Sequence, residues 1–389
     1  KYWYYSEILT QYNKSEGEMI DEGVKVFKKV FSRLGEQIKN KKLIIPLSGG
    51  YDSRGIVSSL NKFSKKKDFD TITTLHPSGS EKETVDKITQ KLNIRNKYIE
   101  RPKDIYKKYF VIKAFLSDAM VQEHLWVMPM LNKIKKYDTY IDGIAGDIVL
   151  RSTRVRPVHI EKQNDSMYLS RLFKKQLGFD YNWLKEYIDP KVWRKIKYTP
   201  KWAKDCLEKI KESENRFVIF LMIYRIRNGV SSSPNNIVGS QILDVIQPYF
   251  NDELVTFGLS IPHKYKFDGI YRKILDRAFP ELKDVKSTSD INLAKEREYD
   301  QRILEFDKNP RELIADYLEV SKEDKAFLFY LFKKLEAPPF INKPKFLKDY
   351  LSEPKFNRLV TFLDFMVWYN LFENKTKNLQ SIVKKYRQK

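Results

Sequence analysis

A short segment near residue 50 combines the residue types that bind phosphate, and it reads Pro46-Leu47-Ser48-Gly49-Gly50-Tyr51-Asp52-Ser53. Adjacent glycines let the backbone wrap closely around an anion, while serine hydroxyls and helix N-terminal N–H groups supply hydrogen-bond donors. The carboxylate of Asp52 would repel a bare phosphate unless a cation such as Mg²⁺ bridged the two groups. The segment lacks the Gly-Lys-Ser/Thr ending of a Walker loop. An ordinary Gly-Gly turn is the alternative, but the complete Ser-Gly-Gly-X-Asp-Ser string favours a magnesium-assisted phosphate site.

The elements around this segment predict how it is positioned. Residues 42–47 form a short apolar run typical of a buried strand, and a helical pattern continues through Ile56, Val57 and Leu60. Upstream, apolar residues recur at helical spacing from Met19 to Gln37. The segment therefore lies at a strand-to-helix junction, where the amino end of a helix faces the phosphate.

Strands and helices alternate through the first part of the chain. Further strands are predicted at residues 71–75, 97–99 and 139–141, with a loop at residues 76–80 and a helix around Val85, Ile88 and Leu92. This alternation predicts an α/β fold with a Rossmann-like parallel sheet and helices on both faces. Beyond about residue 155, aromatic-rich runs at residues 217–223 and 327–332 predict a mainly helical C-terminal part, and the tail from Lys375 onward is expected to form a terminal helix.

Composition narrows the class of protein. The chain has 389 residues, of which 42% are hydrophobic, enough to bury a core, so a disordered chain is excluded. Its formal net charge of +22 favours a polyanionic partner, yet no nucleic-acid-binding motif is present and a solvated lysine-rich surface is the preferred interpretation. A single cysteine, Cys206, excludes a disulfide framework and a cysteine zinc site. No apolar run approaches membrane-span length and no signal peptide opens the sequence, so we expect a soluble, cytoplasmic protein without a membrane partner.

The phosphate-binding segment resembles the pyrophosphate loop (PP-loop) of the N-type ATP pyrophosphatases, whose fold is adenine nucleotide alpha hydrolase-like. Other segments narrow the resemblance to the asparagine synthetase-like family, which also includes β-lactam synthetases and lasso-peptide cyclases. The similar segments are Lys1-Tyr2-Trp3, the Gly- and acid-containing loop Asp142–Asp147, the segment Leu243–Asn251 and the segment Tyr271–Arg277. The resemblance covers about residues 1–150 and 225–280.

The resemblance implies an ATP-dependent carbon–nitrogen ligase that forms AMP and pyrophosphate. It would adenylate a carboxylate on a small molecule or peptide and pass it to an amine or ammonia. The cofactors implied are ATP and Mg²⁺, with Mg²⁺ held by Asp52 and Asp147 and with Lys273 as the catalytic lysine. The residues implied to bind ATP are Leu47, Ser48, Gly49, Gly50, Tyr51, Asp52, Ser53 and Gly143. Taken singly, Asp147 is also explained as a helix-capping carboxylate and Lys273 as a solvated lysine.

The same resemblance implies a domain plan. Residues 1–17 would link to a glutaminase-like domain or subunit expected upstream of Lys1, and residues 18–155 would form the ATP-pyrophosphatase core. Residues 156–290 would be a helical continuation that completes the synthetase site, and residues 291–389 a helical extension.

Several residues depart from the family pattern. Ile144 stands where the amide-forming synthetases have a glutamate that accepts a proton from the amine, so asparagine synthesis itself is not expected. Ile246, Asn251 and Arg54 replace an Arg, an Asp and a Ser. These changes favour a substrate other than aspartate. The alternatives are a tRNA-modifying ATP pyrophosphatase, supported by the net charge, and a nucleotide-binding protein that has lost catalysis, supported by Ile144.

Overall fold

The structure is a computed structural model of the chain. It describes residues 7–64, 68–75, 81–117, 125–152, 155, 160–161, 164–170, 181–196, 199–229, 238, 243–287, 321–352 and 356–372.

A five-stranded parallel sheet forms the centre of the N-terminal part, with the strand order β3-β2-β1-β4-β5. The strands are β1 (Leu43–Pro46), β2 (Asp70–Leu75), β3 (Arg95–Glu100), β4 (Thr139–Ile141) and β5 (Asp244–Ile246). The chain proceeds from β1 outward to β2 and β3, then crosses back to β4 on the other side of β1. In parallel sheets, the crevice at such a reversal, beyond the carboxyl ends of the strands, is where ligands bind.

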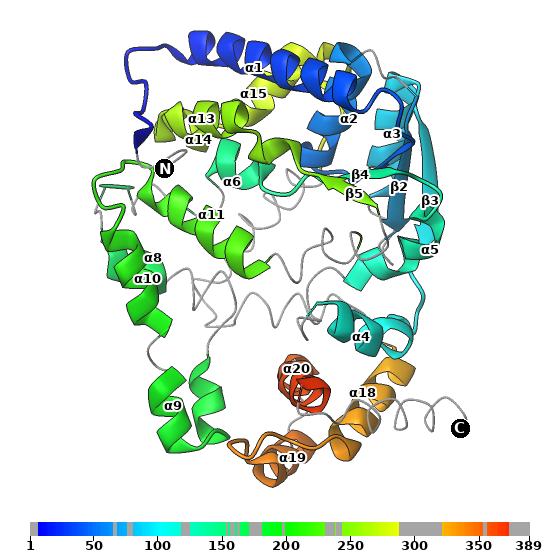
Figure 1. Cartoon of the computed structure of the whole chain (residues 1–389), viewed down its shortest axis with the longest axis vertical. Coiled ribbons are helices and arrows are strands. Elements are labelled where there is room, and N and C mark those ends of the chain that lie inside the picture. The colour runs from blue at the N-terminus through cyan, green and yellow to red at the C-terminus, as the bar shows by residue number, and fades with distance from the viewer. Residues whose placement is uncertain are drawn as a thin grey trace.

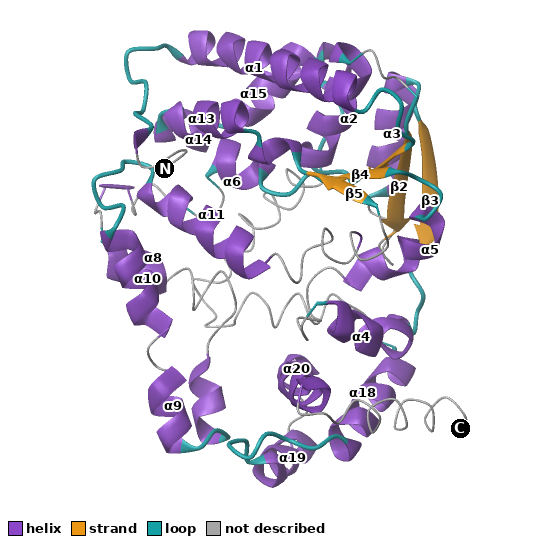
Figure 2. Ribbon diagram, in the orientation of Figure 1, coloured by secondary structure: helices purple, strands orange, loops and turns teal. Residues whose placement is uncertain are grey.

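Helices surround the sheet and continue into the C-terminal part, as Figures 1 and 2 show. They are α1 (Glu16–Gln37), α2 (Tyr51–Phe63), α3 (Lys82–Leu92), α4 (Ile105–Leu116), α5 (Leu131–Ile134), α6 (Gly146–Arg151), α8 (Asp165–Ser170), α9 (Pro190–Ile196), α10 (Thr199–Glu208), α11 (Arg216–Gly229), α13 (Asp252–Ser260), α14 (His263–Phe267), α15 (Ile270–Ala278), α18 (Lys322–Lys334), α19 (Lys343–Ser352) and α20 (Phe356–Phe372). The predicted α/β class with a helical C-terminal region is confirmed. None of the described helices is long and apolar enough to cross a membrane.

The side chains of β1 alternate between two hydrophobic cores. Leu43 and Ile45 join a core with α1, α2, α3, α13 and α15, whereas Ile44 joins a second core with α4, α5, α18 and α20. This period of two is what a strand covered on both faces requires. The sheet therefore connects the N-terminal helices to the C-terminal helices.

Helix α1 begins three residues before the predicted start at Met19. Ser15 caps its amino end in a capping box: the Ser15 hydroxyl accepts from the N–H of Glu18, and the Glu18 carboxylate accepts from the N–H of Ser15. The Ser-X-X-Glu spacing is visible in the sequence. The predicted start was later because it was taken from the apolar pattern, which begins only at Met19. In Figure 1, α1 lies across α13 and α15, which it contacts.

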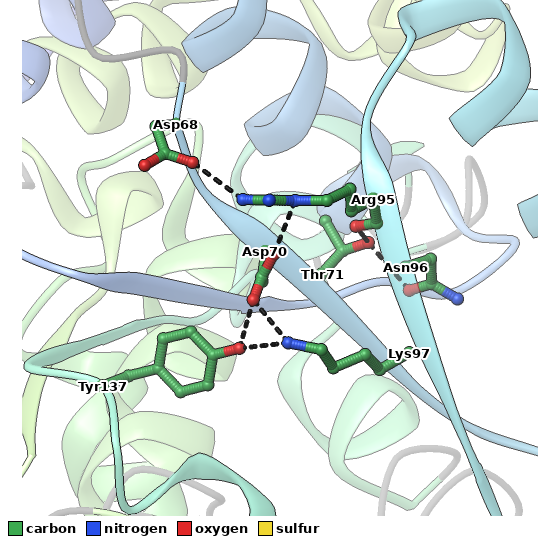
Figure 3. A network of polar contacts seen from close by, with 7 residues as sticks. All are labelled: Asp68, Asp70, Thr71, Arg95, Asn96, Lys97 and Tyr137. Atoms are coloured by element: carbon green, nitrogen blue, oxygen red, sulfur yellow. Dashed lines mark hydrogen bonds and ion pairs between the residues drawn. The ribbon is translucent and has the colours of Figure 1, made fainter.

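A polar network joins the amino ends of β2 and β3 (Figure 3). The loop between β1 and α2 lies at the opposite, carboxyl end of the sheet. Asp70 accepts hydrogen bonds from Lys97 and Tyr137, and Arg95 pairs with Asp70 and Asp68 at 3.1 and 2.8 Å. Burial acts to raise the pKa of Asp70, but the bonds from Lys97 and Tyr137 lower it below its ordinary value. The network fixes the strand ends away from the site.

Candidate nucleotide-binding site

Hydrogen bonds to the hydroxyls of Ser48 and Ser53 keep the loop between β1 and α2 compact. Ser53 Oγ accepts from the N–H of Ser48 at 3.0 Å, and Ser48 Oγ accepts from the N–H of Gly50 at 3.2 Å. Gly50 is the N-cap residue of α2 and contributes no side-chain cap to the first helical N–H groups. Those groups, together with the positive end of the helix dipole, suit a phosphate. The structure thus brings residues 47–53 together as a compact turn at the carboxyl end of β1.

Asp52 follows β1 and Asp147 follows β4, and these two strands are neighbours in the sheet. A hydrogen bond joins the two residues. The backbone N–H of Asp147, at the start of α6, donates to Asp52 Oδ2 at 3.1 Å. The turn before α6 requires Ala145 to adopt a left-handed conformation, with φ of 73°. Burial, and next the charge of Asp147, raise the pKa of Asp52 well above its ordinary value. The ionised form of Asp52 is therefore disfavoured at this position.

Glycines allow the two loops to approach this closely. A Cβ atom on Gly146 would lie 2.6 Å from Asp52 Oδ1, and one on Gly143 would lie 3.2 Å from both Asp52 Cβ and the backbone nitrogen of Ser53. Gly143, predicted to contact the nucleotide, therefore packs against the first turn of α2. Any larger residue at position 146 would displace the carboxylate.

Two buried tyrosines support the first turn of α2. Tyr249 donates from its hydroxyl to the backbone oxygen of Asp52 at 2.9 Å, and its hydroxyl lies 2.6 Å from that of Tyr271. Burial, with Asp52 contributing, raises the pKa of both phenols well above the ordinary value, so both remain protonated. Both lie within segments of the family resemblance, but nothing in the pattern assigned them a role, because buried aromatic residues are common in cores.

Two arginines flank the aromatic ring of Tyr51. The guanidinium carbons of Arg54 and Arg151 lie 5.5 and 5.6 Å from its ring centroid. Arg54 is buried and donates to the backbone oxygens of Val285 at 2.6 Å, Lys286 at 3.3 Å and Gly49 at 3.4 Å. Arg54 thus ties the loop between β1 and α2 to the segment that follows α15.

Lys273 lies on α15, where its ammonium group pairs with Glu16 of α1 at 2.7 Å. Tyr271, which contacts the loop, is two residues away on the same helix, so the two side chains point in opposite directions. Arg277 also faces α1, where it pairs with Asp21, whereas Arg272 pairs with Asp276 on its own helix. The catalytic role of Lys273 stays a prediction, since the structure places its charge beside Glu16.

The donor set at the site fits Mg²⁺. Within the described part of the chain, no three His, Cys, Asp or Glu side chains gather as a complete metal cage. Carboxylates such as those of Asp52 and Asp147 are the ligands through which Mg²⁺ bridges a protein and substrate phosphates. Three segments considered in the sequence, Lys1-Tyr2-Trp3, residues 76–80 and the tail from Lys375, lie outside the described residues.

The fold and this loop define an α/β protein with a parallel sheet and a glycine-rich turn at the carboxyl end of β1. The family model "Asparagine synthase" matches residues 38–284, more than half of the chain, so the chain belongs to the asparagine synthase family. Members of this family are ATP-dependent amide ligases. No curated protein matches the chain. The match includes residues 151–224, where the sequence motifs alone indicated no resemblance.

Proposed function

We propose that this chain is an AMP-forming ligase that adenylates a carboxylate other than aspartate and transfers the acyl group to an amine or ammonia. The observation that carries the proposal is the hydrogen bond from Asp147 to Asp52 Oδ2 beside the serine- and glycine-rich loop. It supports a site in which two carboxylates and a helix amino end face the same phosphates.

Adenylation cleaves ATP between its α- and β-phosphates, and negative charge develops on both fragments. The N–H groups at the start of α2 and the loop hydroxyls hold the phosphates in line. Asp52 and Asp147 would hold Mg²⁺, which would supply positive charge to neutralise the phosphate oxygens. The hydroxyl of Tyr249 donates one hydrogen bond to the backbone oxygen of Asp52 and so fixes the backbone there. The acyl acceptor then completes amide formation as AMP leaves.

The amine source belongs to the same proposal. Ammonia from a glutaminase domain or subunit is one source, with residues 1–17 as the linker, residues 18–155 as the core, residues 156–290 completing the site and residues 291–389 as an extension. An amine within the substrate itself is the other. Amide formation that requires added ammonium chloride identifies ammonia as the source, whereas amide formation without it identifies an amine within the substrate.

The direct experiment incubates the chain with ATP, MgCl₂ and a panel of ¹⁸O-labelled carboxylates that includes the amino acids. Phosphorus NMR then follows AMP and pyrophosphate. We expect one carboxylate class to transfer ¹⁸O to AMP, and aspartate with ammonium to be a poor pair. Release of ADP and phosphate, or AMP without ¹⁸O, would contradict the proposal.

The second candidate is adenylation of a base in tRNA, favoured by the net charge of +22. A parallel reaction with total tRNA in place of the carboxylates decides between the two. Pyrophosphate release that depends on tRNA would replace the first candidate with the second.

A further inference from the structure

Asp142 is a buried carboxyl group with one oxygen that has no partner. It directly follows β4 and is 9% exposed. The N–H groups of Gly143 and Ile144 hydrogen-bond its carboxylate, and Oδ2 has no hydrogen-bond partner, so those bonds fall on Oδ1. A buried acceptor left without a donor is costly, which is why such atoms in folded proteins mark ligand or water sites.

The backbone of Asp142 lies beside the candidate nucleotide site. Its backbone N–H donates to the oxygen of Ile246 at the end of β5, and the next residue, Gly143, packs against Asp52 and Ser53. Asp142 therefore lies at the carboxyl edge of β4, next to β1, where the strand order reverses. Asp142 is thus the immediate neighbour in sequence of Gly143, which packs against the first turn of α2.

The surroundings of Asp142 suit a group that gains and loses a proton. Tyr140, two residues earlier on the same face of β4, has a fully buried hydroxyl that also lacks a partner. Burial, and next the charge of Asp142, raise the pKa of Tyr140 well above its ordinary value. Burial raises the pKa of Asp142 to about 6, against the two backbone bonds that lower it.

We propose that Asp142 Oδ2 binds the amine substrate and accepts its proton during amide formation. This inference rests on the proposed function. The amine nitrogen forms a bond to the acyl carbon of the acyl adenylate, the bond from that carbon to the AMP oxygen breaks, and the proton on nitrogen passes to Asp142 as AMP leaves. Ile144, the loop residue where the family resemblance places a glutamate, has no atom that accepts a proton.

The first test observes Asp142 without needing the acyl substrate. The full chain is labelled with [¹³Cγ]aspartate, and Asp142→Asn identifies the Asp142 signal by its loss. Ammonium chloride is the probe and tetramethylammonium chloride, which has no N–H donor, is the matched control. We expect the signal to titrate near pH 6, and ammonium alone to lower that midpoint by about one unit. An equal response to both salts, or none, would overturn the proposal.

The second test separates the two half-reactions. With the carboxylate identified as above, Asp142→Asn should retain carboxylate-dependent ATP–pyrophosphate exchange while losing about 10²–10⁴ in the rate of amide formation. The acid limb of the wild-type pH–rate profile near pH 6 should disappear in the variant. Equal loss of both half-reactions would reduce Asp142 to a structural role and refute proton acceptance.

The two proposals fail in distinguishable ways. If no carboxylate supports exchange in the wild-type chain, the proposed function fails, and the ammonium titration still decides whether Asp142 binds an amine. If exchange occurs and Asp142→Asn forms amide at the wild-type rate, the ligase stands and the assignment of Asp142 is wrong.

Discussion

Asp147 donates its backbone N–H to Asp52 Oδ2 at 3.1 Å, across 95 residues of sequence. This bond joins the loop after β1 to the loop after β4. It orients the carboxylate of Asp52 against the backbone of Asp147. Burial and the neighbouring charge both disfavour ionised Asp52 and raise its pKa well above its ordinary value. The predictions below follow from this arrangement.

Gly146→Ala should displace Asp52, because the new Cβ atom would stand 2.6 Å from its Oδ1. We expect at least a tenfold loss of affinity for the non-hydrolysable analogue α,β-methylene-ATP in MgCl₂, measured by calorimetry. Gly17→Ala is the matched control: no atom lies within 4 Å of its Cβ position. That variant should gain about 0.4–1 kcal/mol in free energy of unfolding and keep wild-type affinity. Equal affinities for the two variants would refute the role given to Gly146.

Arg54→Met should loosen the phosphate-binding loop, since the backbone oxygens of Gly49, Val285 and Lys286 each lose a charged donor. We expect a loss of about 1–3 kcal/mol in free energy of unfolding, measured by urea denaturation, and weaker nucleotide binding. Arg33→Met removes an exposed arginine that pairs with Glu253 and should cost less than about 1 kcal/mol. Similar losses in both variants would show that the backbone contacts of Arg54 stabilise the protein no more than an exposed ion pair does.

Lys273→Ala tests whether that lysine is catalytic or only a partner of Glu16. A catalytic ammonium should be worth about 10²–10³ in kcat with nearly unchanged nucleotide affinity. Glu16→Gln breaks the same ion pair but keeps the ammonium, so it should retain activity. Matching small effects in the two variants would assign Lys273 to the α1–α15 contact alone.

Lys266 should make stability rise with pH. It is 2% exposed, and burial lowers its pKa from 10.5 to about 7. Between those values the unfolded chain binds the extra proton, so the free energy of unfolding should increase by up to about 1.4 kcal/mol per pH unit relative to Lys266→Met. Urea denaturation from pH 7 upward measures this difference, with Lys264→Met, at an exposed position of the same helix, following wild type. Parallel curves for wild type and Lys266→Met would contradict a neutral buried lysine.

Local patterns were sufficient to predict the elements that position the site. The apolar run of β1, the glycine-rich turn and the start of α2 depend on neighbouring residues, and so do β2, β3 and β4. Strand β5 was not predicted: its three residues, Asp244–Ile246, carry no alternating pattern, and their extended conformation comes from parallel pairing with β4. Its place at the edge of the sheet therefore depends on tertiary contacts.

Side-chain roles that depend on contacts between distant segments could not be predicted from the sequence. Asp52 and Asp147 were singled out by their loops, and the structure brings them together, while their metal-binding role stays a prediction. Tyr249 and Tyr271 reach the loop from segments about 200 residues away, with separations that no local periodicity encodes. The direction of Lys273 is likewise a property of how α15 packs against α1.

The most direct measurement of the central claim is calorimetric binding of α,β-methylene-ATP to wild type and Asp52→Asn, each with MgCl₂ and with EDTA. Wild type should lose at least tenfold in affinity when the metal is removed, because two carboxylates then face the phosphates as like charges. Asp52→Asn should bind more weakly than wild type in MgCl₂ and should lose most of its dependence on the metal. Asp68→Asn, which removes an exposed carboxylate at the opposite sheet edge, should behave as wild type. Unchanged affinity and unchanged metal dependence in Asp52→Asn would contradict the site described for this chain.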